Sequence, residues 1–389
     1  MDSKVSAGSC VFAGFVTLMV AMGIGRFLYT PLLPIMLTEY GMRTDQAGLL
    51  ASLNYIGYLA GAFSAGPLSH RFREYRVLAA GLILSCLTTA ATGLTTDFGW
   101  VSAARLVAGA ASGLAFVAGS GMVLVVMARE GKERLAGLYY GGVGAGIVAT
   151  GLAASPAARV MGAAGTWVVF GVVAAFLSAM ILFLLRHEGG ERKSAAVAKE
   201  ALPRSPAFLR LVIAYGLEGF GYIITGTFMV AAANATVGST GAQLAWVVAG
   251  CAALPSAFLW SLAAHRWGRL KPLVAAFFLQ SAGVILPALC PGVVSLFAGA
   301  ILFGATFMGI VTLALSEGAS FAPTARSRVV ALMTGIYGIG QILGPSLAGY
   351  FSARTGSYLW SLSIASAAVA LAGILIVYDA FNPRDQPGS

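Results

Sequence analysis

Long apolar segments follow one another along the chain, separated by short polar breaks. Each is close to the roughly 20 residues that a helix needs to cross the hydrocarbon core of a bilayer. Twelve such segments lie at residues 10–37, 45–68, 77–96, 100–127, 135–158, 165–186, 207–232, 242–264, 272–290, 293–316, 328–352 and 357–380. The pattern predicts an all-α membrane protein with twelve transmembrane helices and no sizeable soluble domain.

The composition supports this class, since 58% of the 389 residues are hydrophobic, 10% are charged and the mean hydropathy is +0.86. The apolar run after the opening "MDSK" is too long for a signal peptide, so we expect it to be the first span. The four cysteines have no C-x-x-C spacing, which predicts neither a disulfide framework nor a metal site. No Walker-type glycine loop and no hydrolytic constellation is present, so we expect no cofactor and no enzymatic activity.

The basic residues indicate how the chain is oriented. The net charge is +10, but the positive residues lie in short loops rather than in a basic domain, which argues against nucleic acid as a partner. Nineteen of the 24 basic residues fall in alternate breaks, and only Arg43, Arg159 and Arg354 fall in the others. The positive-inside rule then predicts that both termini are cytoplasmic, in a bacterial inner (plasma) membrane.

An internal repeat divides the chain into halves. The segment "SHRFREYR" (69–76) recurs as "AHRWGRLK" (264–271), 195 residues later, and "GLYYGG" (137–142) recurs as "GIYGIG" (335–340). The repeat predicts two pseudo-symmetric six-helix bundles, at 1–186 and 207–389, joined by a charged cytoplasmic linker at 187–206.

Charges inside the spans are the main candidates for function, because an arginine at the centre of a span costs about 2.5–3.5 kcal/mol on insertion scales. Arg26 is the only charge between residues 11 and 37, and Tyr29 and Thr30 follow it on the same helix face. Glu218 is the only acidic residue near the middle of a span, and Tyr222 continues its face. We therefore expect Arg26 to face a cavity and to bind substrate with Tyr29 and Tyr222.

Arg26 and Glu218 allow two interpretations. By the repeat offset, the counterpart of Glu218 in the first helix lies about one turn, roughly 5 Å, on the cytoplasmic side of Arg26, a gap that two long side chains can span. A permanent ion pair would only hold the halves together. Alternatively, the guanidinium binds a substrate carboxylate while the buried carboxyl exchanges a proton.

Other polar residues in spans are weaker candidates. The pairs Asn54 with Tyr58 and Tyr337 with Gln341 are suited either to binding substrate or to bridging helices. Arg105 is a second candidate for proton coupling, but it lies near a helix end, where its side chain could instead extend to the interface. Glu317 and Asp379 lie near helix ends and are expected to be solvated. Glycine pairs four residues apart are expected to serve helix packing: Gly57/Gly61, Gly109/Gly113, Gly142/Gly146 and Gly340/Gly344.

Over its whole length the chain resembles the major facilitator superfamily, and specifically its YbfB/YjiJ-like bacterial branch. The stretches that carry the closer resemblance are "GIGRFLYTPLLP" (23–34), "SLNYIGYLAGA" (52–62) and "YGLEGFGYIITGTF" (215–228). The resemblance implies two six-helix bundles around a central cavity lined by the first, fourth, seventh and tenth helices, with substrate near the midplane. "RLVAGAASG" (105–113) is similar to a fourth-span motif whose arginine is associated with proton coupling in some members of the superfamily.

The superfamily's cytoplasmic loop motif, glycine-x-leucine-alanine-aspartate-arginine-x-glycine-arginine, is similar to 66–74 and 261–269. The arginine is kept as Arg71 and Arg266, and Gly268 and Arg269 match the end of the motif in the second copy. The first copy departs from it, because Arg73 replaces the second glycine and Glu74 the arginine that follows. Both copies have histidine at the aspartate position, as His70 and His265, so an aspartate-centred latch is not expected.

These features predict a secondary active transporter that works by alternating access. We expect a proton-coupled symporter of a small organic anion such as a monocarboxylate, monomeric in the bilayer, in which Arg26 anchors the anion and Glu218 carries the proton. The alternatives are a proton-driven exporter of amphipathic drugs or metabolites, in which Glu218 binds a lipophilic cation, and a non-transporting membrane sensor.

The distribution of basic residues makes the topology testable. Cysteines placed at Arg71 and Arg266 should be labelled by impermeant maleimides only from the cytoplasmic side, and a cysteine at Arg43 only from the outside. Labelling of the cysteine at position 43 from inside the cell would overturn the predicted orientation.

Overall fold

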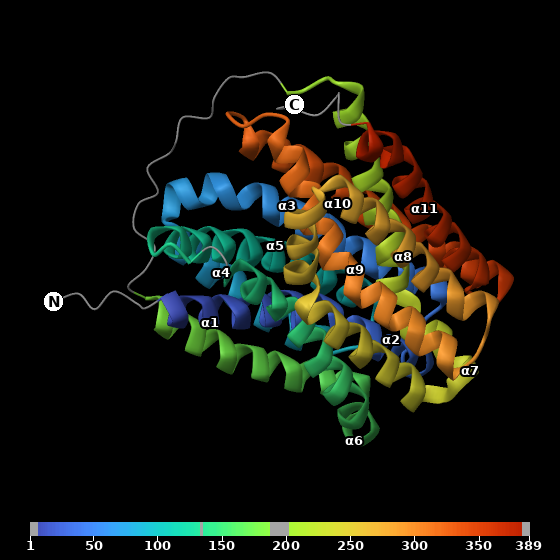
Figure 1. The fold of residues 1–389 in the computed structure, drawn as a ribbon. Coiled ribbons are helices and arrows are strands. Elements are labelled where there is room, and N and C mark those ends of the chain that lie inside the picture. Colours follow the sequence, from blue (N-terminus) through green and yellow to red (C-terminus); the bar gives the residue numbers. More distant parts are fainter. Residues whose placement is uncertain (1–6, 133–134, 187–201, 383–389) are drawn as a thin grey trace. The chain divides into compact units, whose positions relative to one another are not determined.

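The computed structural model describes residues 7–132, 135–186 and 202–382 (Figure 1). The chain divides into two compact units, Met1–Ser194 and Ala195–Ser389. The boundary falls within the predicted linker 187–206, of which residues 187–201 lie outside the described part of the chain, so the linker stays a prediction.

The first unit is built from helices throughout its described part. Its first span is continuous from residue 8 to residue 39 but changes its helix type twice. The remaining spans follow, and a single long helix that bends at Gly162 completes the unit. The elements are α1 (Ala7–Leu18), the π-helix η1 (Met19–Phe27), α2 (Tyr29–Glu39), α3 (Thr44–Phe72), α4 (Glu74–Thr92), α5 (Phe98–Arg129) and α6 (Ala136–Leu185).

The second unit repeats this organisation in its own helices. It begins with a long helix that bends at Gly238 and thereby contributes two spans. Its elements are α7 (Pro206–Trp267), α8 (Leu270–Leu289), α9 (Val293–Ser320), α10 (Arg326–Thr355) and α11 (Leu359–Phe381).

Within the described residues, nine helices are long and apolar enough to cross a membrane. Two of them, α6 and α7, each contain two spans, because Gly162 (φ 69°) and Gly238 (φ 73°) interrupt the helical dihedral angles. The 29-residue helix α3 is the remaining predicted span; it is less apolar and is not among the nine. The observed helices therefore correspond to the twelve predicted spans, six in each unit.

The backbone conformations repeat with the sequence. Positive φ angles recur at positions about 195 residues apart in the two units: Gly41 and Gly238, Arg73 and Gly268, and Gly162 and Gly356. These positions end helices, where a left-handed residue reverses the chain and where glycine carries no steric penalty. Arg73 (φ 66°, ψ 140°) is the exception among the described residues, since it is the one non-glycine residue with positive φ.

The cytoplasmic loop motif lies at these same helix ends. His70 and Arg71 are in the last turn of α3, and His265 and Arg266 are in the last turn of α7. Arg73 alone connects α3 to α4. The first copy therefore departs from the motif in residue type but not in backbone conformation, because Arg73 adopts the positive-φ region that Gly268 adopts in the second copy.

Glycines bring neighbouring helices into backbone contact. α3 and α5 lie side by side (Figure 1), and a Cβ atom added at Gly57 would lie 1.9 Å from the carbonyl oxygen of Leu106. A Cβ at Gly109 would lie 1.9 Å from the carbonyl oxygen of Asn54, and the repeat-related Gly304 faces Ala249 in the same way, at 2.0 Å. In the second unit, a Cβ added at Gly340 would lie 2.3 Å from the carbonyl oxygen of Gly216, so the predicted packing role of the glycine pairs is confirmed in each unit.

Gly57→Ala should destabilise the first unit, because its methyl group would meet a backbone carbonyl that has no room to move. We expect a loss of about 1–3 kcal/mol, seen as a lower midpoint of thermal unfolding in detergent. Gly66→Ala in the same helix is the matched control, since no atom lies within 4 Å of the added Cβ there. Equal unfolding midpoints for the two variants would contradict the proposed packing.

Candidate functional site

Arg26 is positioned by a change of helix type within the first span. Residues Met19–Phe27 form the π-helix η1, which includes Gly23 and Gly25. Glycine weakens the α-helix, and π-helical turns inside α-helices occur frequently at functional sites. Gly23 also lies against the backbone of Gly146 in α6, where an added Cβ would be 2.4 Å from the neighbouring Cα.

The guanidinium of Arg26 is buried among aromatic rings, with 3% of the residue exposed. Its Cζ lies 4.4 Å from the ring centroid of Tyr55 and 4.1 Å from that of Tyr58, both in α3. Its Nη1 is 3.5 Å from the sulfur of Met22. Cation–π contacts of this kind stabilise a cation away from water.

Arg105 lies in the same unit and is also buried. Its Nη1 donates a hydrogen bond of 3.1 Å to the carbonyl oxygen of Gly25, and its Cζ lies 4.9 Å from the ring centroid of Tyr29 and 5.6 Å from that of Trp167. Extension of this side chain to the membrane interface, the alternative left open by the sequence, is therefore wrong. Asn54 links the two neighbouring helices by donating from Nδ2 to the carbonyl oxygen of Arg105, at 2.9 Å.

The structure thus brings together the candidates predicted in the first half of the chain. We call this group the arginine cluster, and it consists of Arg26, Tyr29, Asn54, Tyr55, Tyr58, Arg105 and Trp167. The sequence placed Tyr29 on the same helix face as Arg26. In the structure, the ring of Tyr29 instead lies beside the guanidinium of Arg105, and its hydroxyl donates a hydrogen bond of 2.9 Å to the carbonyl oxygen of Ala47. Trp167 was missed, because it comes from the sixth span and is one tryptophan among many apolar residues.

Glu218 is fully buried in the second unit, with 0% of the residue exposed. Its Oε1 accepts a hydrogen bond of 2.9 Å from Nε2 of Gln280 in α8, whereas its Oε2 has no hydrogen-bond partner among the described residues. Burial of a charged carboxylate with an unsatisfied oxygen is costly, so this setting suits a group that gains and loses a proton. Gln280 was missed by the sequence analysis, although an amide in the middle of an apolar span is a visible signal.

Three further candidates of the second half meet in α7 and α10. Nε2 of Gln341 in α10 donates a hydrogen bond of 2.6 Å to the hydroxyl of Tyr222, one turn after Glu218 in α7. The ring of Tyr222 stacks on Tyr337 with centroids 5.6 Å apart and on Phe307 with centroids 5.8 Å apart. The predicted residues of the second half are therefore neighbours, and they share an aromatic stack.

Arg26 and Glu218 belong to different units, so their direct pairing stays a prediction. Each has contacts within its own unit, with aromatic rings around Arg26 and the Gln280 amide beside Glu218. The roles of all these residues in binding and proton coupling likewise remain predictions.

The expectation that Glu317 and Asp379 are solvated is wrong. Glu317 is 6% exposed and Asp379 is 4% exposed. Nε of Arg210 donates to Asp379 at 2.8 Å, and Nη1 of Arg269 lies 3.4 Å from Glu317. Basic side chains at the helix ends cover these carboxylates. The positions of the two acids near loops in the sequence gave no sign of these ion pairs. Both acids therefore serve the structure of the second unit.

Six spans in each of two units, together with the family match that follows, make the chain a multi-pass membrane transporter. Residues 18–377 match the family described as "uncharacterised MFS-type transporter YbfB", where MFS stands for the major facilitator superfamily, and the chain belongs to this family. The expected superfamily and branch are thereby confirmed.

Two known proteins are similar to the chain. The chain is 26% identical over 360 residues to the uncharacterized MFS-type transporter YceJ of Bacillus subtilis (strain 168), covering 88% of this chain and 89% of that protein. It is similar in structure to the crystal structure of a mutant of the nucleoside transporter NupG, with a TM-score of 0.79, 12% identity, and coverage of 94% of this chain and 99% of that one. At that identity, the second likeness shows the fold alone.

Proposed function

We propose that the chain is a proton-coupled secondary transporter of small organic anions such as monocarboxylates, working by alternating access. The observation that carries the proposal is the burial of two arginines in one six-helix unit, held by aromatic rings and a carbonyl oxygen. Membership of a transporter family favours this function over the sensor alternative.

The geometry of Arg26 suits recognition of a carboxylate. The guanidinium lies over the rings of Tyr55 and Tyr58, and its N–H groups lie along the edges of its plane. A carboxylate binds most strongly in the guanidinium plane, through two parallel hydrogen bonds. A substrate carboxylate that engages Arg26 would therefore bind at the edge of the guanidinium rather than at the faces that lie over the tyrosine rings.

The setting of Glu218 suits proton coupling. Its Gln280 partner supplies one hydrogen bond, which is compatible with either protonation state. In the proposed cycle, a substrate anion that engages Arg26 leaves Glu218 in a more negative environment and favours its protonation. Anion and proton then bind together, and by linkage a lower pH tightens anion binding.

NupG is named as a nucleoside transporter, but at 12% identity this substrate is not inferred for the present chain. A nucleoside also lacks the carboxylate that the arginine cluster is suited to bind. The substrate class is best decided by counterflow in proteoliposomes with labelled monocarboxylates, nucleosides and amphipathic cations. Exchange of the cations alone would favour the exporter alternative, and exchange of nucleosides alone would contradict the anion proposal.

Arg26→Ala should weaken binding of the transported acid by about 30-fold or more, because a charge-assisted pair is lost. Arg26→Lys keeps the positive charge but loses the paired N–H donors of the planar guanidinium, so it should restore only part of the affinity. Arg354→Lys is the matched control, since Arg354 also stacks on a tyrosine, Tyr350, with Cζ 4.5 Å from the ring centroid, yet lies at an exposed helix end. Unchanged half-saturation in counterflow for Arg26→Ala would exclude the anchor role.

Glu218→Gln should separate binding from energy coupling, because glutamine mimics the protonated carboxyl. We expect substrate affinity at least equal to that of the wild type, little pH dependence across the range from acidic to neutral, intact exchange of substrate for substrate, and no accumulation driven by an imposed proton gradient. Glu39→Gln, an acid at the end of α2 outside the proposed site, should accumulate substrate normally. Accumulation by Glu218→Gln in response to a pH gradient would shift the coupling role to Arg105.

A further inference from the structure

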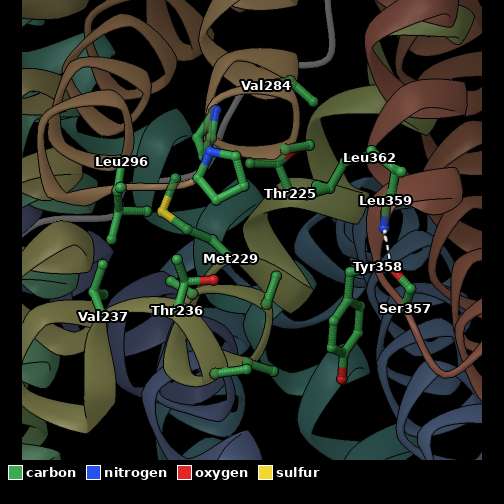
Figure 2. A pocket seen from close by; sticks show the side chains of 18 of the residues that line it. Thr225, Met229, Thr236, Val237, Val284, Leu296, Ser357, Tyr358, Leu359 and Leu362 are labelled. Carbon is green, nitrogen blue, oxygen red and sulfur yellow. Dashed lines mark hydrogen bonds between the residues drawn. The ribbon is translucent and has the colours of Figure 1, made fainter.

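The second unit contains a cavity of about 310 Å³ that is separate from the charged residues discussed above. It lies where the first half of α7 ends, and the end of α8 and the beginnings of α9 and α11 form its other walls (Figure 2). On the predicted topology this end faces the outside of the cell. The cavity is of the size at which pockets for small organic molecules begin.

The lining of the cavity selects against charge. Among the described residues that line it, there is no acidic, basic or histidine side chain. Apolar side chains dominate the walls, including Met229, Val284 and Leu296, and Figure 2 shows Met229 directed into the space between α7 and α9. An anion of the kind proposed for the arginine cluster would lose its hydration here without gaining a partner.

Thr225 carries the one buried hydroxyl among the described residues that line the cavity. Thr225 lines the inner part of the cavity and is 3% exposed, and its Oγ1 has no hydrogen-bond partner among the described residues. Buried hydroxyl groups are nearly always hydrogen-bonded, and a helical threonine commonly donates to a carbonyl oxygen one turn earlier. In contrast, Ser357 at the exposed rim accepts a hydrogen bond of 3.2 Å from the backbone nitrogen of Leu359.

We propose that this cavity binds a small, neutral, mainly apolar molecule that carries one hydrogen-bonding group, such as an alcohol, and that Thr225 is its polar anchor. The apolar body of the ligand fills the space around Met229 and Leu296, and its hydroxyl or carbonyl oxygen pairs with Thr225 Oγ1. Because every lining residue belongs to the second unit, this site is distinct from the arginine cluster.

Photolabelling tests the proposal on the full chain in lipid nanodiscs. The probe is octanol carrying a diazirine on its chain, and the comparison probe is the corresponding diazirine-bearing octane without the hydroxyl. Mass spectrometry of the labelled peptides should place the octanol probe on the cavity segments around residues 225–237 and 284–296. The alkane probe should label these segments more weakly, because it cannot pair with Thr225.

Two variants test the Thr225 hydroxyl and the cavity volume separately. Thr225→Val is similar in shape but lacks the hydroxyl, so labelling by the octanol probe should fall about fivefold, the equivalent of one hydrogen bond, while labelling by the alkane stays unchanged. Met229→Trp fills the cavity and should reduce labelling by both probes. Ile213→Trp, at an exposed position of the same helix outside the cavity, is the matched control and should leave cavity labelling unchanged.

If the octanol probe labels the cavity equally in wild type and Thr225→Val, Thr225 is not the anchor. If labelling survives in folded Met229→Trp protein, the cavity is not the binding site. Folding of each variant is checked by gel filtration and by its thermal unfolding midpoint. The readout is binding rather than transport, so the result is independent of whether the chain carries organic anions.

Discussion

The hydrocarbon core of a bilayer offers the peptide backbone no hydrogen-bond partners, and this constraint governs the rest of the structure. Each span must satisfy its own backbone as a helix, and helices surrounded by lipid must associate through close packing. Glycine makes that packing possible here. Gly109 and Gly113 of α5 lie against the carbonyl oxygens of Asn54 and Tyr58, the same residues that surround the buried arginines. The interface between helices α3 and α5 therefore contributes both to the stability of the first unit and to the geometry of its candidate site.

The two units share a backbone plan but accommodate buried charge in different ways. The first holds the guanidinium groups of Arg26 and Arg105 with aromatic faces and a carbonyl oxygen. The second holds the carboxyl of Glu218 with the amide of Gln280, beside a stack of aromatic rings. The backbone plan is thus repeated, whereas the buried side chains differ between the units. In the proposed function, an anion bound in the first unit and a proton bound in the second would each increase the affinity for the other.

The sequence predicted the spans well because a bilayer imposes one length and one hydrophobic character on every crossing helix. It also singled out Arg26, Glu218 and Arg105, since charge in an apolar span is costly and therefore conspicuous. The π-helix around Arg26 was not predictable from a period of 3.6 residues, and for this reason the neighbours expected for Tyr29 differ from those observed. Trp167 was missed because its contact with Arg105 joins helices far apart in sequence, where local periodicity carries no information. Gln280 was visible as an amide in an apolar span, but its contact with Glu218 was not.

At Arg73, the backbone conformation favours glycine, whereas the predicted topology favours a positive charge. Its backbone conformation (φ 66°, ψ 140°) is one that glycine adopts freely and other residues adopt at a cost of about 1–3 kcal/mol. Its side chain contributes one of the positive charges that would retain this connection in the cytoplasm during insertion. A glycine here would relax the hinge between α3 and α4 but would weaken the topological signal of that loop. On the predicted topology, the residue at this single-residue connection therefore affects both the folding stability of the first unit and its orientation in the membrane.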